Sequence, residues 1–130
     1  MDLEEQTTNT PIFTLNGYQT LAKVVHVYDG DTIHVVFKYF DAYYKWVCRI
    51  AHVDTPELRT KNEEEKRKGY ETRDKLRELI LNKIVNLQCL QFDKYGRLLA
   101  EIYINDIHVN QWLIDNHLAK QYEGGTKEKW

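Results

Sequence analysis

The stretch TLAKVVHVYDGDTIHVVFKYF, residues 20–40, decides the fold. It contains two runs rich in β-branched and aromatic residues, 20–28 and 32–40, and such runs predict strands. Asp29-Gly30 lies between the two runs, and this dipeptide in that position is a strong signal for a hairpin. A third run of the same kind, YYKWVCRIAHV at 43–53, follows. The three runs together predict an antiparallel meander.

A helix and two further strands are expected after the meander. Residues 58–69 are almost all charged, which is typical of a solvated loop or of the exposed start of a helix. The runs 84–92 and 98–104, joined by a turn that contains Gly96, predict two strands, and 109–117 predicts a short amphipathic helix. The longer helix before them is expected to bury one apolar stripe, which consists of Tyr70, Leu76, Leu79 and Ile80.

The order of these elements predicts the architecture. Five strands with a helix between the third and the fourth follow the order of an OB-type barrel. The expected fold class is therefore α+β, a five-stranded OB-fold (Greek-key) β-barrel with two to three helices. A length of 130 residues fits a single domain. We expect this domain to span residues 11–125, between a flexible N-terminal tail at 1–10 and a C-terminal tail at 126–130.

The composition excludes several classes of protein. The formal net charge of -2 argues against a protein that coats nucleic acid by bulk charge, but it leaves a local basic site open. No apolar run is long enough to span a membrane, and the acidic N-terminus lacks the features of a secretory signal. Cys48 and Cys89 make neither a disulfide framework nor a zinc cluster, and we expect both to be buried. An intracellular protein with no membrane partner is expected.

Carboxylates at strand ends are the first candidates for chemistry. Asp31 follows the hairpin turn, and Asp54 and Glu57 lie in the segment VDTPE after the third strand. Two converging carboxylates repel each other unless a cation or a proton lies between them, and oxygen-only ligands favour Ca²⁺ or Mg²⁺. Thr55 can add its main-chain carbonyl. Taken singly, each motif also fits a plainer interpretation, a hairpin turn for the first and a helix N-cap or turn for the second.

Basic residues supply the second half of the pattern. Arg49 lies inside an apolar strand, where an unpaired guanidinium is costly, and Arg97 ends the turn DKYGR at 93–97. Two arginines beside a metal form a phosphate clamp, because a guanidinium binds phosphate through two parallel hydrogen bonds. Lys94 can add a point charge and Tyr95 a stacking face for a base. The plainer interpretations are a rim ion pair for Arg49 and a solvated hairpin for Arg97.

The ordered set of motifs resembles the staphylococcal nuclease family over residues 11–125. The matching segments are Asp29-Gly30-Asp31-Thr32, then Arg49 with Asp54-Thr55-Pro56-Glu57, then 93–97. The resemblance implies a Ca²⁺-dependent endonuclease, with Mg²⁺ or Mn²⁺ as alternative cations, that cleaves DNA, RNA or both and leaves 3′-phosphate ends. It also implies a monomer and, since no leader is apparent, an intracellular homologue, of viral or host-cytoplasmic type among the alternatives.

The resemblance assigns a role to individual residues. It implies that the carboxylates of Asp31 and Asp54 and the main-chain oxygen of Thr55 bind the metal, and that Glu57 is the general base. The scissile phosphate would be held by Arg49 and Arg97, and the neighbouring nucleotide by Lys94, Tyr95 and Tyr122.

A different class of function is the alternative. The same barrel occurs as a catalytically weak module that binds nucleic acid or protein. The chain departs from the family after Leu118-Ala119-Lys120, where Tyr122 is the only nearby tyrosine and the family enzyme has two. Site completeness discriminates between the two classes, because a degraded copy usually lacks one or more functional residues. This chain retains Asp31, Arg49, Asp54, Glu57 and Arg97, which favours the nuclease.

Overall fold

The computed structural model describes residues 2–124 and residue 130. Within this part of the chain, neither α-helix has the length and apolarity needed to cross a membrane. The elements are η1 (Leu3–Glu5), β1 (Gln19–Val27), β2 (Thr32–Tyr39), β3 (Ala42–Ile50), β4 (Val53–Asp54), α1 (Glu63–Ile80), β5 (Ile84–Phe92), β6 (Leu98–Ile104), β7 (Ile107–His108), α2 (Val109–Asp115) and β8 (Lys120–Gln121).

The long strands close into a barrel. They pair in the order β3-β2-β1-β5-β6, and β3 also pairs with β6, which joins the two ends of the sheet. This closing pair is parallel, with Cys48 opposite Leu98 and Ile50 opposite Ala100, whereas the other pairs are antiparallel. The closing pair covers only Cys48–Ile50 of β3 and Leu98–Ala100 of β6, so the hairpin end of β3 keeps a free edge. The predicted five-stranded OB-fold barrel is confirmed.

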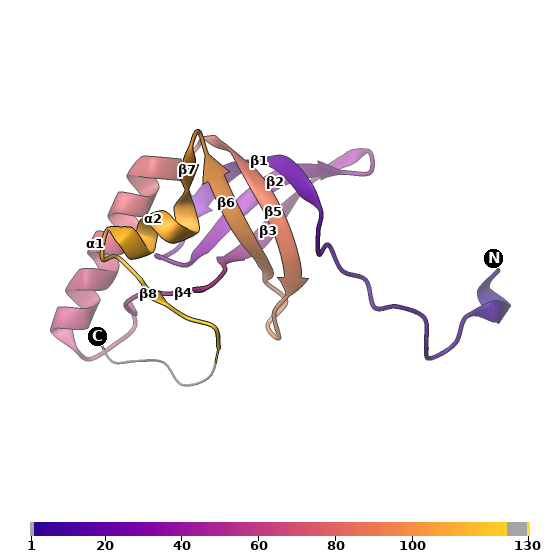
Figure 1. Cartoon of the computed structure of the whole chain (residues 1–130), viewed down its shortest axis with the longest axis horizontal. Coiled ribbons are helices and arrows are strands. Elements are labelled where there is room, and N and C mark those ends of the chain that lie inside the picture. Colours follow the sequence, from indigo (N-terminus) through magenta and orange to yellow (C-terminus); the bar gives the residue numbers. More distant parts are fainter. Residues whose placement is uncertain (1, 125–129) are drawn as a thin grey trace.

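The two α-helices lie on one side of the barrel, and the β2–β3 hairpin extends away on the other side (Figure 1). Strand β6 alternates strictly between buried and half-buried residues, as a strand with one face toward a core must. Leu76 and Ile80 of α1 and Leu113 of α2 are fully buried against this core. Each such side chain contributes about 1.5–3 kcal/mol. Cys48 and Cys89 are also buried in the core, as predicted.

Helix α1 begins inside the charged segment that was expected to be a loop or a helix start. The Asn62 side chain caps it by accepting a hydrogen bond from the Glu65 N–H at 3.1 Å, and acidic residues fill the first turn, where the helix dipole favours them. The predicted stripe is wrong at Tyr70, which is exposed with the Arg73 guanidinium 4.6 Å from its ring. The buried face of the helix consists of Gly69, Thr72, Leu76 and Ile80.

The third predicted strand, 43–53, is interrupted. Strand β3 ends at Ile50, the chain turns with His52 at φ 66°, and Asp54 lies in β4, which pairs with β8. Buried Asn110 fixes this turn, because its Nδ2 donates to the carbonyls of Ala51 (2.9 Å) and Ala100 (3.1 Å). Asp54 therefore belongs to a small separate sheet and does not directly follow a long strand (Figure 1).

The domain boundaries stay predictions. Residues 2–14 are exposed, and Leu15 is the first buried residue of the chain. The expected C-terminal tail at 126–130 lies outside the described residues, except for Trp130. Helix α2 ends at Asp115, two residues before its expected end, and the N–H groups of Leu118 and Ala119 return to the carbonyl of Leu113.

Candidate functional site

The turn between β1 and β2 lies against the segment that follows β4. Gly30 is buried there, and a Cβ added to it would lie 2.6 Å from Thr72 Cγ2 and 3.0 Å from Thr55 Cβ. A side chain at this position would push the two segments apart. The Asp29 side chain shapes the turn by accepting hydrogen bonds from the N–H groups of Asp31 (3.1 Å) and Thr32 (2.9 Å). The absence of a side chain at Gly30 therefore lets the turn approach Thr55.

Arg49 connects Asp31 to the segment that carries Asp54. Its Nη2 lies 3.5 Å from Asp31 Oδ2 and donates to the Val53 carbonyl at 2.8 Å. Asp54 itself is 4% exposed. Burial, with Asp31 beside it, raises the pKa of Asp29 to about 7. Carboxylates crowded into a poorly solvated region favour binding of a cation.

The donor set of this region fits a hard cation. Asp31, Asp54 and the Thr55 carbonyl offer only oxygen, which suits Ca²⁺ or Mg²⁺ and not a zinc site of sulfur and nitrogen ligands. Within residues 2–124 and 130, no three side chains of His, Cys, Asp or Glu form a group that could hold a metal. A cation here would accordingly be held by two carboxylates and main-chain oxygen, with water completing its coordination.

The two arginines predicted to bind phosphate are both connected to Asp31, one directly and one through Thr32. Arg97 Nη1 donates to Thr32 Oγ1 at 3.3 Å, and that hydroxyl donates to Asp31 Oδ1 at 3.0 Å. Arg49, which is 8% exposed, contacts the other oxygen of the same carboxylate. Thr32 and Arg49 are also directly opposite each other in the β2–β3 ladder. The ladder therefore places Thr32, which accepts the hydrogen bond from Arg97, next to Arg49.

The turn between β5 and β6 holds Arg97 in place. Asp93 Oδ1 accepts hydrogen bonds from the N–H groups of Tyr95 (2.8 Å) and Arg97 (2.9 Å), while its Oδ2 accepts one from Arg97 Nε at 2.8 Å. Burial alone would raise the pKa of Asp93, but the hydrogen bonds from Arg97 and Tyr95 outweigh it and lower the pKa. The turn is an exposed hairpin at Lys94, Tyr95 and Gly96, as in the plainer interpretation, and within it Asp93 holds the half-buried Arg97.

A hollow of about 470 Å³ opens beside the arginines. Of the residues predicted from the sequence, it is lined by Arg49, Lys94, Tyr95, Arg97 and Tyr122. The pairing of β4 with β8 positions Tyr122, whose N–H donates to the His52 carbonyl at 3.0 Å. The remaining lining residues are Ala51, His52, Leu90, Asp93, Leu99, Glu123 and Gly124. We call this hollow the arginine pocket.

The predicted general base does not line the arginine pocket. The Glu57 side chain is exposed, and its backbone N–H donates to Glu65 Oε2 of α1 at 3.0 Å. Asp31, Asp54 and Thr55 do not line the pocket either, although Asp31 is joined to it through Arg49. The structure therefore gathers the residues predicted to bind phosphate and nucleotide in one hollow, and of the predicted carboxylates it links Asp31 to that hollow through Arg49.

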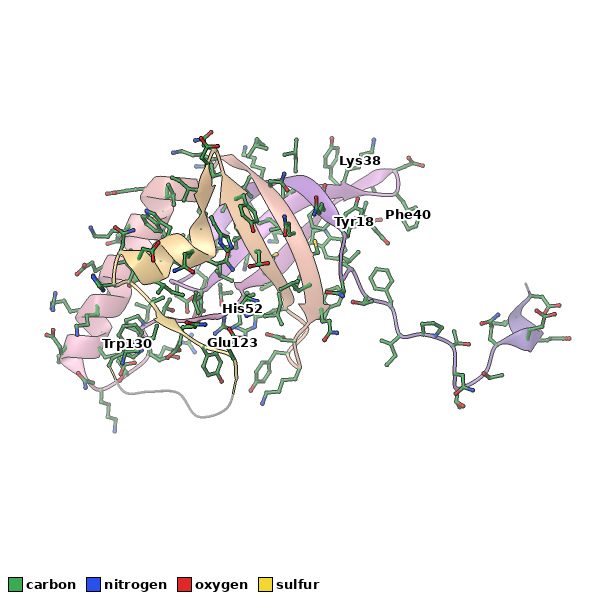
Figure 2. All side chains as sticks on the ribbon, in the orientation of Figure 1. Tyr18, Lys38, Phe40, His52, Glu123 and Trp130 are labelled. Atoms are coloured by element: carbon green, nitrogen blue, oxygen red, sulfur yellow. The ribbon has the colours of Figure 1, made fainter. Side chains whose placement is uncertain are left out.

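Some residues that line the pocket were not predicted from the sequence. No role in the site was predicted for His52, but its Nδ1 lies 3.2 Å from Glu123 Oε2, and both residues line the pocket. Figure 2 shows the two residues close together. They are 71 positions apart, so no local motif signals the pair. Asp93, in contrast, stands four residues before Arg97 within the quoted motif, and an acceptor at the start of a turn is a recognisable signal.

Comparison with known proteins gives a consistent picture. Residues 47–129 match the family model described as "Staphylococcal nuclease homologue". An "Uncharacterized endonuclease" of Escherichia coli O157:H7 is 32% identical over 102 residues, which cover 78% of this chain and 60% of the relative. "Endonuclease YncB" of Bacillus subtilis (strain 168) is 33% identical over 105 residues, which cover 76% and 48%. An uncharacterized protein of Bacillus anthracis is 37% identical over 101 residues, which cover 75% and 45%.

These relatives are longer proteins, and this chain spans between 45% and 60% of their length. The matched range contains Arg49, Asp54, Glu57 and Arg97, and it begins after Asp31. Because the family model matches more than half of its residues, the chain belongs to the staphylococcal nuclease homologue family.

Proposed function

We propose that this chain is a divalent-cation-dependent endonuclease that hydrolyses phosphodiester bonds in DNA, RNA or both. The observation that carries the proposal is that Arg49 and Arg97 line the same pocket and are both linked to Asp31, Arg49 directly and Arg97 through the Thr32 hydroxyl. Family membership and the names of two relatives, both endonucleases by name, support it.

The arginine pocket would bind the scissile phosphate. Arg49 is held by the carbonyls of Ile50 and Val53, and Arg97 is held by Asp93. Both guanidinium groups are therefore oriented before substrate arrives, so little reorganisation is needed as negative charge develops on the phosphate oxygens. A donor oriented in this way typically contributes about 10²–10³-fold to the rate.

The proposed cation ligands are Asp31, Asp54 and the main-chain oxygen of Thr55, with Ca²⁺ as the first candidate and Mg²⁺ or Mn²⁺ as alternatives. A bound divalent cation supplies Lewis acidity and a more acidic water. The chain holds these ligands by three local devices, namely the close approach at Gly30, the contact of Arg49 with Asp31, and the pairing of Asp54 with Lys120 between β4 and β8.

Glu57 would remove a proton from the attacking water. The water oxygen forms the new bond to phosphorus and the bond from phosphorus to the 5′ oxygen breaks. The leaving oxygen takes a proton from solvent water and becomes a hydroxyl, and Glu57 returns its proton to solvent. The products are then a 3′-phosphate end and a 5′-hydroxyl end. The adjacent nucleotide would stack on Tyr95 and Tyr122 and pair its phosphate with Lys94, with stacking contributing about 1–3 kcal/mol per base.

The test is a cleavage assay on single-stranded DNA and RNA with Ca²⁺, Mg²⁺, Mn²⁺ or EDTA, with analysis of the product ends. Cleavage that requires a cation and leaves 3′-phosphates is the expected result. Asp54→Asn should abolish the cation response, and Asp106→Asn, which alters an exposed acid in the β6–β7 turn, should retain it. Binding of nucleic acid without cleavage under any cation would replace the nuclease with a binding module.

A further inference from the structure

The outer surface of β1, β2, β3 and β5 carries lysines and no acidic residue. The chain has 20 Asp and Glu residues, yet none of them lies in these strands. In the register of the sheet, Lys23 lies between Ile84 and Val36, and Val36 lies opposite Lys45. Lys38 lies opposite Tyr43 in the next outward-facing row. We call this surface the lysine face, made of Lys23, Val36, Lys38, Tyr43, Lys45 and Ile84.

The lysine face is continuous with the arginine pocket. Side chains alternate between the two sides of a strand, so the residues of β3 that share a side with Arg49 are Val47, Lys45 and Tyr43. Cys48, between them, is buried in the core. Arg49 lines the pocket, and the same row of side chains therefore leads from the pocket to the far end of the hairpin.

The face offers both charge and flat apolar surface. It contains a hollow of about 670 Å³ whose lining includes Lys23, Lys38, Tyr43 and Ile84. Tyr43 is 71% exposed, and Lys38 Nζ lies 6.0 Å from the centre of its ring. Exposed rings flanked by lysines are the combination that binds bases by stacking and phosphates by charge.

The end of the hairpin holds an aromatic residue in an unfavourable backbone conformation. Phe40 has φ 51°, which L side chains of this size rarely adopt, and it is 82% exposed. Figure 2 shows Phe40 and Lys38 together at the end of the hairpin, away from His52 and Glu123 at the pocket. Phe40 is the first residue of the two-residue turn between β2 and β3, and turns of this length need a positive φ. The exposed ring is thereby held at the end of the hairpin, next to the lysine face.

The charge of the face selects its occupant. A second copy docked by a two-fold axis would bring Lys23, Lys38 and Lys45 against the same lysines. We infer that the lysine face is a second binding surface for single-stranded nucleic acid, which carries the strand away from the arginine pocket. The inference rests on the proposed function, because its ligand is the proposed substrate.

The dimensions of the sheet set how many nucleotides are needed to reach from the arginine pocket to the far end of the lysine face. At about 3.3 Å per residue, Lys38 lies about 20 Å along β2 from Thr32. A stacked strand advances about 3.4 Å per nucleotide, so about six nucleotides reach from the pocket to Lys38. Oligonucleotides shorter than about six nucleotides should therefore gain nothing from the far end of the face.

The experiment measures binding of fluorescent oligothymidine of about 20 nucleotides by anisotropy in EDTA, so that it does not depend on cleavage. The K23Q/K38Q/K45Q variant should bind at least about tenfold more weakly than the wild type, and the slope of log K against log salt should fall in magnitude by about 2. The matched control K61Q/K66Q/K75Q removes the same charge from the region of α1 and should bind like the wild type.

Every outcome bears on the inference. Equal losses in both variants, an unchanged salt slope, or tighter binding of duplex than of single strand would overturn it. Light scattering that shows a dimer lost only in K23Q/K38Q/K45Q, with oligonucleotide binding unchanged, would assign the face to self-association. A length series measured on the wild type alone gives a further test. Affinity should still rise as the oligonucleotide passes about six nucleotides, the length that reaches Lys38, and no gain at that length would overturn the inference. Failure to cleave under any cation, with this binding intact, would refute the proposed function and leave the lysine face standing.

Discussion

The arginine pocket and the lysine face present positive charge in opposite ways. In the pocket, Arg49 and Arg97 are fixed by carbonyls and carboxylates and are largely withdrawn from water. On the face, the lysines stand exposed on strands without acidic residues. A fixed, poorly solvated cation can stabilise charge at one atom, whereas exposed lysines act over a longer range that salt screens. We propose that the pocket performs the chemistry and the face recruits the strand.

The comparison also explains why the overall charge is misleading. The formal net charge is -2, but none of the acids lies within β1, β2, β3 or β5. Glu63, Glu64 and Glu65 begin α1, and further acids occupy the N-terminal segment. A protein of slightly negative charge can therefore present a basic track to a polyanion.

The largest expected effect comes from the proposed general base. Glu57→Gln keeps the size of the side chain and should lower the cleavage rate by about 10²–10⁴-fold without weakening oligonucleotide binding. Single-turnover cleavage measures the rate, and Glu78→Gln on α1 is the control. Undiminished cleavage by Glu57→Gln would remove this residue from the mechanism.

The next largest effect is expected at Gly30, where the β1–β2 turn packs closely against Thr55 and Thr72. Gly30→Ala places a methyl group against Thr55 and Thr72, and it should lower the free energy of unfolding by about 1–3 kcal/mol and impair cleavage. Thr72→Ser removes the nearest methyl and keeps a hydroxyl for the Leu118 carbonyl, so it should restore part of the loss in the double variant. Denaturant unfolding measures both. No stability change in Gly30→Ala would show that the segments are not tightly packed.

A smaller effect is expected at the turn that braces Arg97. Asp93→Ala removes three hydrogen bonds and should lower the free energy of unfolding by about 1–2 kcal/mol. The pKa of Asp93 is lowered in the fold, so its stabilisation is present at neutral pH and is lost as the pH falls below the ordinary Asp value of 3.8. Unfolding curves at several pH values should converge for the two proteins in acid. A difference that persists there would mean that the charge plays no part.

The smallest effects are expected at Phe40, at the end of the hairpin next to the lysine face, where stability and binding should change in opposite directions. Asn tolerates the left-handed conformation better than Phe, so Phe40→Asn should raise the free energy of unfolding by about 0.5–1 kcal/mol. The same change should weaken single-strand binding about fivefold through lost stacking. Thermal unfolding and anisotropy provide the two readouts. Unchanged binding would show that bound nucleic acid does not reach Phe40 at the end of the hairpin.

Most of the barrel is predictable because its signals are local. Alternating residues and Asp29-Gly30 give the first hairpin, and the order of the remaining runs gives the barrel. The β4–β8 pair escapes prediction because Asp54 and Lys120 lie far apart in the chain and pair over only two residues. The burial of Tyr70 was predicted from helical spacing, but Gly69 and Thr72 take that face. Gly69 lies close to Leu58 and to the main chain at 56–57, where no larger side chain fits.

The candidate site is predictable where chemistry is written into a motif and unpredictable where it depends on packing. Arg97 and Asp93 share one turn, so the motif contains both. His52 and Glu123 meet only through the return of the chain after α2. The lysine face has no motif at all, since Lys23, Lys38 and Lys45 lie on three strands and share a surface only in the observed register.

One kinetic comparison tests the division of labour most directly. It measures kcat and KM for a dinucleotide and for an oligonucleotide of about 20 nucleotides, using wild type, Arg97→Ala and K23Q/K38Q/K45Q. We predict that Arg97→Ala lowers kcat on both substrates by about 10²-fold or more. The lysine variant should raise KM on the oligonucleotide alone and leave the dinucleotide unaffected. A lysine variant that loses kcat on the dinucleotide, or an Arg97→Ala protein that retains it, would contradict the account.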